Sequence, residues 1–478
     1  MKQYQIIIVF LVLAFGLFLR LYKINSPVAD WHSFRQADTM SVTKIFSQNN
    51  FDFFHPKYFD VSSTQSGKDN PQGYRMVEAP IYNTISLFFY NTFHLNIELT
   101  SRLVSIIFSL GSGLLIFLFV FNHTNLFLPS IFSLFIFMVL PFNVYYSRTI
   151  LPEPTAVFFM MLSLYLFQKN IYFSGLALAL SILVKPYTAL ILLPTILVLN
   201  KKFYKLIIFG IIAITPFLLW RLWISQYPEG IPVSNWLLNN GNTVTFPSWF
   251  HGYNLSFLNK LVALRPHWWY WLFQDRLGNL ILGLYGVIPL FLGFAYRRKR
   301  IQAISLSLGF GIFLYFLIIA QGNIQHDYYQ TLIIPSIAIL SGLGYFYIYQ
   351  ILFKSYFLKI SSLVLIFAIS IFFSYERVIE YYKINNQNII IAGQMVDKMV
   401  PKNAIVIAPY NGDTALLYQT NRKGYPIEVY DFDSITTKFS STPVYFVSVN
   451  FDDYTNKIIK TYPTIYRDSQ FIILQISK

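Results

Sequence analysis

The sequence lacks cysteine and is poor in charged residues. No cysteine occurs among its 478 residues, which excludes disulfides and thiolate metal sites. Charged residues make up only 12% of the chain, against 55% hydrophobic and 19% aromatic residues. Soluble domains carry roughly twice that share of charge. The composition therefore indicates that a membrane is the solvent for most of the chain.

Motifs for nucleotide chemistry are also missing. The sequence has no glycine-rich phosphate loop, dinucleotide fingerprint or nucleophile elbow. The net charge is +15, but the basic residues stand in short clusters between apolar stretches. Such clusters are typical of cytoplasmic loops and suit anionic lipid headgroups. Membrane lipids are therefore expected partners, and nucleic acid is not.

Apolar stretches long enough to cross a bilayer recur between residues 5 and 376. A spanning helix needs about 20 apolar residues. We predict about eleven crossings, at 5–22, 100–121, 126–146, 152–168, 171–185, 188–199, 206–225, 277–296, 301–320, 331–352 and 360–376.

The C-terminal region has a different character, since residues 378–478 are polar and mixed. Strand-like runs occur at 403–409, 442–449 and 470–476, with turns predicted at 411–413 and 422–424. The predicted fold class is a polytopic α-helical membrane protein, residues 1–376, followed by a small α/β domain, residues 377–478.

The charge clusters predict an orientation. The first stretch has no small-residue cleavage site after it, so it is predicted to be a retained span. With the N-terminus inside, the clusters at 201–205, 297–300 and 354–359 all face the cytoplasm. The loop 23–99 and the C-terminal domain then lie outside, and 81–95 is predicted as an interfacial helix. A bacterial cytoplasmic membrane suits the absence of cysteine.

Ionisable residues gather in the first outer loop. Asp30, His32, Arg35 and Asp38 follow the first span closely, and Glu78 closes the loop. A carboxylate beside a guanidinium can deprotonate an acceptor hydroxyl while the cation holds a phosphate. The alternative is a solvated juxtamembrane helix with a local ion pair.

A second group of ionisable and phenolic residues lies near predicted span ends. Such residues are costly near hydrocarbon and often mark a site. The group consists of Arg148, Glu153, Lys185, His326, Tyr328 and Tyr329. Two structural alternatives remain: Glu153 caps a helix N-terminus, and Lys185 extends to the interface without a functional role.

Metal-ligand spacing is not apparent. The seven histidines are scattered, with no pair four residues apart on a helix. A metal site would have to assemble in three dimensions, for example from Glu78 with His251 or His267.

Taken together, these motifs resemble membrane glycosyltransferases of the GT-C fold, in the branch related to protein O-mannosyltransferases and aminoarabinose transferases. The resemblance covers about residues 1–350. It rests on residues 31–39 after the first span, 78–82 at the end of the loop, 147–154 in the next outer turn, and 326–329 before an apolar helix.

The resemblance implies transfer of a hexose or pentose from a polyprenyl-phosphate donor to an envelope glycan, lipid or protein. It implies that Asp30 or Asp38 is the base and that Glu153 matches the family's second acidic motif. Many members have an Asp-Glu pair where this chain has Arg35 and Gln36. The resemblance implies no obligatory cofactor, and it leaves open whether a divalent cation takes part.

The other candidate residues receive roles in substrate binding. Arg35, Arg148 and Lys185 are candidates to neutralise the leaving phosphate. The remaining candidate contacts are His32, Glu78, His326, Tyr328 and Tyr329.

Two other functions are compatible with these features. A transporter or flippase for lipid-linked sugars would also need charge within the membrane, although no internal repeat is apparent. An assembly scaffold without catalysis is the third hypothesis, if Arg35 and Gln36 mark lost chemistry.

Overall fold

The computed structural model describes residues 2–200, 202–232, 266–296, 298–351 and 355–477. The chain forms two compact units. The helical unit contains the described residues of Met1–Ile24, Arg102–Arg221 and Ser234–Tyr381. The second unit is named the outer-loop unit after the loop 23–99, which the sequence predicts to lie outside. It contains Asn25–Ser101, the described residues of Leu222–Val233, and the described part of Tyr382–Lys478.

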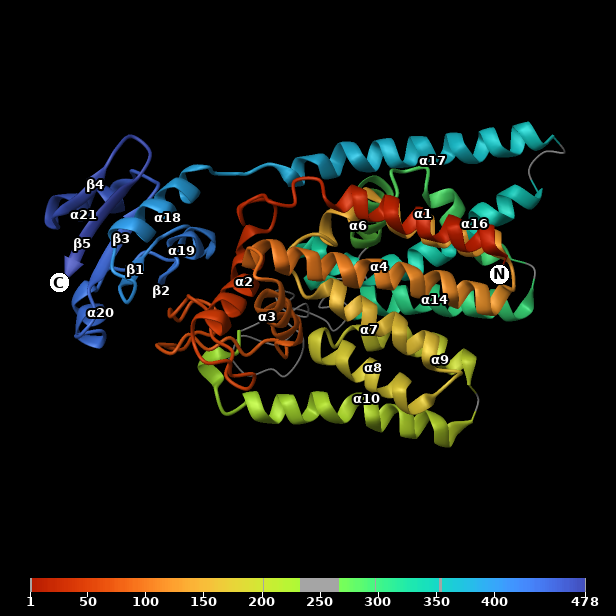
Figure 1. Ribbon diagram of the computed structural model, residues 1–478, viewed down its shortest axis with the longest axis horizontal. Helices are drawn as coiled ribbons and strands as arrows, with labels where there is room; N and C mark the ends of the chain where they lie inside the picture. The colour runs from red at the N-terminus through yellow and green to blue at the C-terminus, as the bar shows by residue number, and fades with distance from the viewer. Residues whose placement is uncertain (1, 201, 233–265, 297, 352–354, 478) are drawn as a thin grey trace. The chain divides into compact units, whose positions relative to one another are not determined.

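The helical unit is a bundle of apolar helices (Figure 1). Its α-helices are α1 Gln3–Arg20, α4 Ile97–Thr124, α5 Phe127–Val139, α6 Pro141–Tyr146, α7 Glu153–Leu166, α8 Ile171–Val184, α9 Thr188–Leu199, α10 Phe203–Ile224, α12 Pro266–Trp271, α13 Val287–Leu292, α14 Lys299–Ile318, α15 Ala320–Gln325, α16 Ile334–Ile351 and α17 Tyr356–Val378. Shorter or wider helical turns are η4 Leu272–Ile281, η5 Gly293–Ala295, η6 Asp327–Ile333 and η7 Ile379–Tyr382. The first residues of α4, the last of α10 and the end of η7 belong to the outer-loop unit.

The described helices confirm a polytopic membrane protein. Six of them are long and apolar enough to cross a bilayer, and four shorter apolar helices accompany them. Helical backbone satisfies its own hydrogen bonds, which hydrocarbon requires. Helical segments occur within every range predicted to cross, one of them interrupted by a turn, and the number of eleven crossings stays a prediction.

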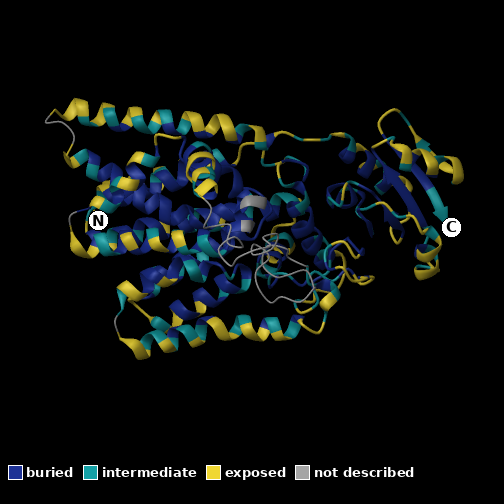
Figure 2. Cartoon of the chain, turned by 180° about the vertical axis from the view of Figure 1, so that it is seen from behind, coloured by how far each residue is buried: buried dark blue, intermediate teal, exposed yellow. Residues whose placement is uncertain are grey.

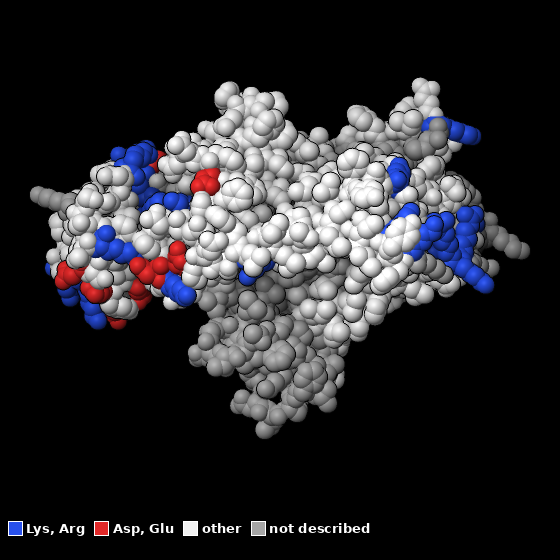
Figure 3. All heavy atoms as spheres, turned by 90° about the horizontal axis from the view of Figure 1, so that it is seen from below, with Lys and Arg blue, Asp and Glu red and all other residues white. Residues whose placement is uncertain are grey.

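Burial separates the core of the bundle from its lipid-facing helices. The apolar window containing α16 is 94% buried, whereas that of α17 is only 17% buried (Figure 2). Glycines let the core helices approach closely: a Cβ on Gly344 would lie 1.7 Å from the carbonyl oxygen of Pro289 in α13. Over these helices the face drawn in Figure 3 carries few charged side chains, with Lys and Arg gathered toward one end.

One predicted span is not a regular helix. The range 277–296 contains the end of η4, a turn, α13 and η5. In the turn, Gly283 has φ +54°, and a Cβ there would lie 1.7 Å from the carbonyl oxygen of Ser370 in α17. Glycine thus permits both the left-handed backbone and the close approach to α17.

The outer-loop unit combines helices of the first loop with the C-terminal α/β domain. Its helices are α2 Ser33–Gln48, α3 Ile81–Phe93, α18 Asn388–Met399, α19 Ala415–Thr420, α20 Phe432–Lys438, α21 Asp453–Thr461 and the short turn η1 Pro228–Gly230. Its strands are β1 Ile405–Ile407, β2 Lys423–Tyr425, β3 Val444–Ser448, β4 Thr464–Arg467 and β5 Ile472–Ser477.

The sheet has strand order β2-β1-β3-β5-β4. Strands β2, β1 and β3 are parallel, and β5 pairs antiparallel with both β3 and β4. Three strands match the predicted runs. The turn predicted at 422–424 is wrong, because residues 423–425 form edge strand β2, and β4 was not predicted.

The first loop contributes to this sheet. The amide of Gly424 donates to the carbonyl of Phe59 (2.9 Å), and the amide of Val61 donates to the carbonyl of Gly424 (2.9 Å). Val61 is fully buried in the same core as Ile407 and Phe446. The loop therefore extends the sheet at its β2 edge. The domain boundary at 376 and 377 stays a prediction, because contacts do not show which segment folds independently.

Candidate active site

In the helical unit, Glu153 and Lys185 form a buried ion pair. Glu153 begins α7, directly after Pro152, and Lys185 follows the last residue of α8 and precedes Pro186. The prolines end or begin the helices at these points, which brings the two charges to the same end of the packed pair. Lys185 Nζ lies 2.7 Å from Glu153 Oε1, and the side chains are 6% and 1% exposed. Among the described residues, Glu153 Oε2 has no hydrogen-bond partner.

Aromatic side chains surround the lysine. Lys185 Nζ lies 5.4 Å from the centre of the Tyr329 ring, close enough for a cation–π contact. His326, Tyr328 and Tyr329 stack on one another, with ring centres 5.0–5.9 Å apart. Four of the predicted residues besides Glu153 thus gather in one part of this unit.

Asp327 lies within the predicted motif 326–329 but was not among the predicted site residues, and it is the centre of a second polar cluster. The Tyr381 hydroxyl donates to its Oδ2 (2.5 Å), and the Tyr146 hydroxyl donates to its Oδ1. Arg276 Nη1 lies 3.8 Å from Oδ2, and its guanidinium lies over the ring of Trp271. An arginine in this mostly apolar region was a signal that could have identified the cluster.

Arg148 is fully buried at the turn between α6 and α7. Its Nη1 donates to the carbonyl of Lys23 (3.0 Å), just beyond the end of α1, and its guanidinium lies over the Tyr145 ring. A cation beside the carbonyl end of a helix is favoured by the helix dipole.

In the outer-loop unit, Asp38 is held from three directions. Arg75 Nη2 lies 2.9 Å from its Oδ2, and Gln65 Nε2 donates to the same oxygen (3.0 Å). Thr414, from the C-terminal domain, donates to Oδ1 (2.7 Å). The Asp38 side chain is 2% exposed. Both carboxylate oxygens are therefore occupied by donors, as in a structural ion pair.

Arg35 pairs with Glu78, so the beginning of α2 is tied to the end of the loop. These two residues line a small cavity together with Asp38 and Arg75. Its volume is about 20 Å³, enough for one water molecule. The Glu78 carboxylate, proposed above for a metal, thus has a guanidinium partner.

Asp30 lies just before α2. Gln36 Nε2 donates to its Oδ1 (2.6 Å) and to the carbonyl of Trp31 (3.1 Å), and Asp30 is fully buried. The helix begins only at Ser33, because His32 adopts a left-handed conformation with φ 54°. The His32 ring packs edge-on against Trp31.

The described residues contain no group of three or more potential metal ligands. His251, one of the two predicted partners of Glu78, lies outside the described ranges. His267 belongs to the helical unit, where it stacks on Tyr270.

Arg75, Gln65 and Thr414 are the residues of the outer-loop site that sequence reasoning missed. Arg75 and Gln65 stand in a polar loop without regular periodicity. Thr414 is 376 residues away from Asp38 in the chain. No local signal in the sequence pairs residues at that separation.

The fold is that of the GT-C membrane glycosyltransferases. ArnT, the aminoarabinose transferase of Cupriavidus metallidurans, matches in its apo form with a TM-score of 0.62 and in its complex with undecaprenyl phosphate with 0.63. Each match has 12% identity over 98% of this chain and 97% of that one.

A second similar structure is the oligosaccharyltransferase AglB of Archaeoglobus fulgidus in complex with an inhibitory peptide and a dolichol-phosphate. It matches with a TM-score of 0.58 and 10% identity, over 94% of this chain and 69% of that one. No protein-family model matches the sequence, and no curated protein matches it. The GT-C resemblance expected from the sequence is thereby confirmed at the level of the fold.

Proposed function

We propose that this protein is a glycosyltransferase that moves a sugar from a polyprenyl-phosphate donor to an acceptor of the cell envelope. The observation that carries the proposal is the nearly full-length match to ArnT, a structure of which holds undecaprenyl phosphate. Buried polar clusters at the predicted outer ends of the helices support it. The basic clusters predict the orientation, and on that basis we propose that the reaction takes place at the outer face of a bacterial cytoplasmic membrane.

Asp30 is the base in this proposal. Its carboxylate accepts a neutral amide donor from Gln36, whereas the oxygens of Asp38 are occupied by Arg75, Gln65 and Thr414. Because both oxygens of Asp38 accept from donors that join α2 to the loop and to the C-terminal domain, we assign Asp38 a structural role and Asp30 the role of the base. Gln36, the departure from the family's acidic pair, then serves to orient the base.

The bond changes follow from these roles. Asp30 takes the proton of the acceptor hydroxyl, whose oxygen attacks the anomeric carbon. The bond from that carbon to the phosphate oxygen breaks, and polyprenyl phosphate leaves with the bonding electrons. Arg35, which belongs to the same unit as Asp30, is the candidate to neutralise the charge on the leaving phosphate. Arg148 and Lys185, which belong to the helical unit, stay predicted contacts of the phosphate. Glu153 holds the Lys185 ammonium in place, and direct displacement inverts the anomeric centre.

The remaining predicted contacts have supporting roles in the proposal. Tyr328, Tyr329 and His326 form an aromatic wall that can pack against a sugar ring or a prenyl chain. His32 and Glu78 stay candidates for contact with the acceptor. No step requires a metal, and a divalent cation stays an open proposal.

The test uses purified protein in liposomes. Undecaprenyl-phosphate-linked pentose and hexose, each radiolabelled in the sugar, serve as donors, and a membrane extract of the source cells serves as acceptor. We expect label to move from the lipid to the extract. Asp30→Asn should lower the rate at least about 100-fold, in the range of general base catalysis. Asp433→Asn, the same change at an exposed position, should leave it unaltered.

Other outcomes would contradict parts of the proposal. Label that crosses the bilayer while still attached to lipid would identify a flippase. Donor binding without transfer would favour the scaffold. If Asp30→Asn were fully active while Asp38→Asn were well folded but inactive, Asp38 rather than Asp30 would be the base.

A further inference from the structure

The segment containing Asp30 is held by the C-terminal domain on both sides. Before it, Gln419 Nε2 of α19 donates to the carbonyl of Val28 (3.0 Å), and the amide of Asn385 lies 3.4 Å from the carbonyl of Ala29. All these residues belong to the outer-loop unit. The backbone that carries the base is thus fixed by residues more than 350 positions later in the chain.

After Asp30, the same domain contacts the beginning of α2. The Thr414 hydroxyl donates to Asp38 Oδ1 (2.7 Å) and also lies 3.2 Å from the carbonyl of Phe34. The neighbouring Asp413 carboxyl hydrogen-bonds the Ser33 side chain. Gln36, whose side chain donates to Asp30, lies along the helix between Ser33 and Asp38, the residues whose side chains contact Asp413 and Thr414.

The turn that presents Thr414 is itself fixed. Asn411 and Gly412 both have left-handed backbones, with φ 52° and 77°. The amides of Tyr410 and Gly412 both donate to the carbonyl of Pro426 (3.1 Å), and the amide of Ala415 donates to Asp413 (2.7 Å). Asparagine and glycine adopt the left-handed backbone more readily than other residues, and these hydrogen bonds hold the turn in that form. This turn can therefore act as a rigid support.

We propose that the C-terminal domain positions the base, with Thr414 and Gln419 as the positioning residues. They touch the backbone before Asp30 and the helix after it. A displacement of about 1 Å at a reacting group can lower a rate about 100-fold, so holding this segment matters to the chemistry. The inference rests on the proposed function, since it assumes that Asp30 is the base.

The matched variants are Thr414→Val, which keeps the shape but removes the donor, and Thr414→Ser, which restores it. We expect Thr414→Val to lower kcat about 10- to 100-fold, to leave the KM for the labelled donor within about twofold, and to increase hydrogen exchange at residues 28–36. Thr414→Ser should return both readouts close to wild type. Thr455→Val is the control, since Thr455 is also buried in the same domain but hydrogen-bonds Ser448.

A double variant separates positioning from general loss of structure. In the Asp30→Asn background the base is already gone, so adding Thr414→Val should change the residual rate by less than about twofold. A further fall of the same size as in the wild-type background would overturn the inference. So would a Thr414→Val protein with normal kcat, or one with unchanged exchange at residues 28–36. These results would leave the glycosyltransferase proposal standing, whereas inactive wild-type protein would overturn both.

Discussion

Separating Glu153 from Lys185 should destabilise the helical unit strongly. The charges lie 2.7 Å apart, and both side chains are almost completely buried. Lys185→Met leaves the carboxylate without its cation, and Glu153→Gln leaves the ammonium without its anion. Either loss should cost about 3–5 kcal/mol in the free energy of unfolding, the typical result of breaking a buried ion pair. Removing both charges leaves no buried ion, so the free energy of unfolding should fall less in the double variant than in either single variant.

The assay is unfolding of the purified protein in detergent by titration with sodium dodecyl sulfate, followed by tryptophan fluorescence. Wild type, Lys185→Met, Glu153→Gln and the double variant form a double-mutant cycle, and their free energies of unfolding together give the coupling energy between the two charges. The control cycle uses the ion pair of Lys438 and Asp69, whose side chains are 24% and 66% exposed and whose coupling should stay below about 1 kcal/mol. Additive losses at Glu153 and Lys185, with coupling under about 0.5 kcal/mol, would refute the claim that these charges depend on each other.

Three further predictions concern stability. Arg422→Met should cost about 3 kcal/mol, since its buried guanidinium donates to Asp397 and several carbonyls; thermal unfolding measures it. Burial raises the pKa of Asp60 to about 6 from 3.8, so its stabilising contribution should be complete below pH 3.8 and lost as the pH rises through 6. The melting temperature of Asp60→Asn should then depend less on pH than that of wild type. Gly344→Ala should cost about 1–3 kcal/mol, and Gly210→Ala, with open space around it, far less.

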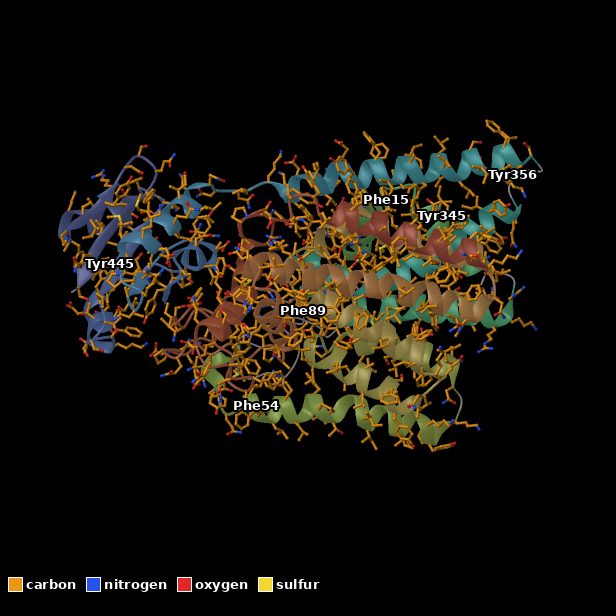
Figure 4. The ribbon with its side chains drawn as sticks, viewed as in Figure 1. Phe15, Phe54, Phe89, Tyr345, Tyr356 and Tyr445 are labelled. Atoms are coloured by element: carbon orange, nitrogen blue, oxygen red, sulfur yellow. The ribbon has the colours of Figure 1, made fainter. Side chains whose placement is uncertain are left out.

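The positions of the helices were predictable because lipid imposes length and apolarity on each crossing segment. Tyr345 in α16 and Tyr356 at the start of α17 illustrate what periodicity did not show (Figure 4). Tyr345 is 7% exposed and Tyr356 is 71% exposed, although both stand in similarly apolar stretches. Which helix is central depends on its neighbours, and this information is not local.

For Glu153 and Lys185 the prediction rested on the cost of placing an ion near hydrocarbon, and that reasoning selected the two residues separately. It did not predict that they pair, because the pairing depends on how α7 packs against α8. The same reasoning applied to Arg276 would have included the cluster around Asp327. The same reasoning could not have selected Thr414, since placing an uncharged residue in a polar domain has no comparable free-energy cost.

The composition change near residue 377 suggested a soluble domain attached to a membrane enzyme, but the contacts connect that domain closely with the first loop. Phe59 and Val61 extend its sheet, and Val61 lies in its core. Removing the C-terminal domain would therefore expose an apolar side chain and leave the carbonyls of Val28 and Ala29 without the donors they have here. Because these carbonyls directly precede Asp30, truncation should disturb the proposed base even if the helices of the membrane still fold.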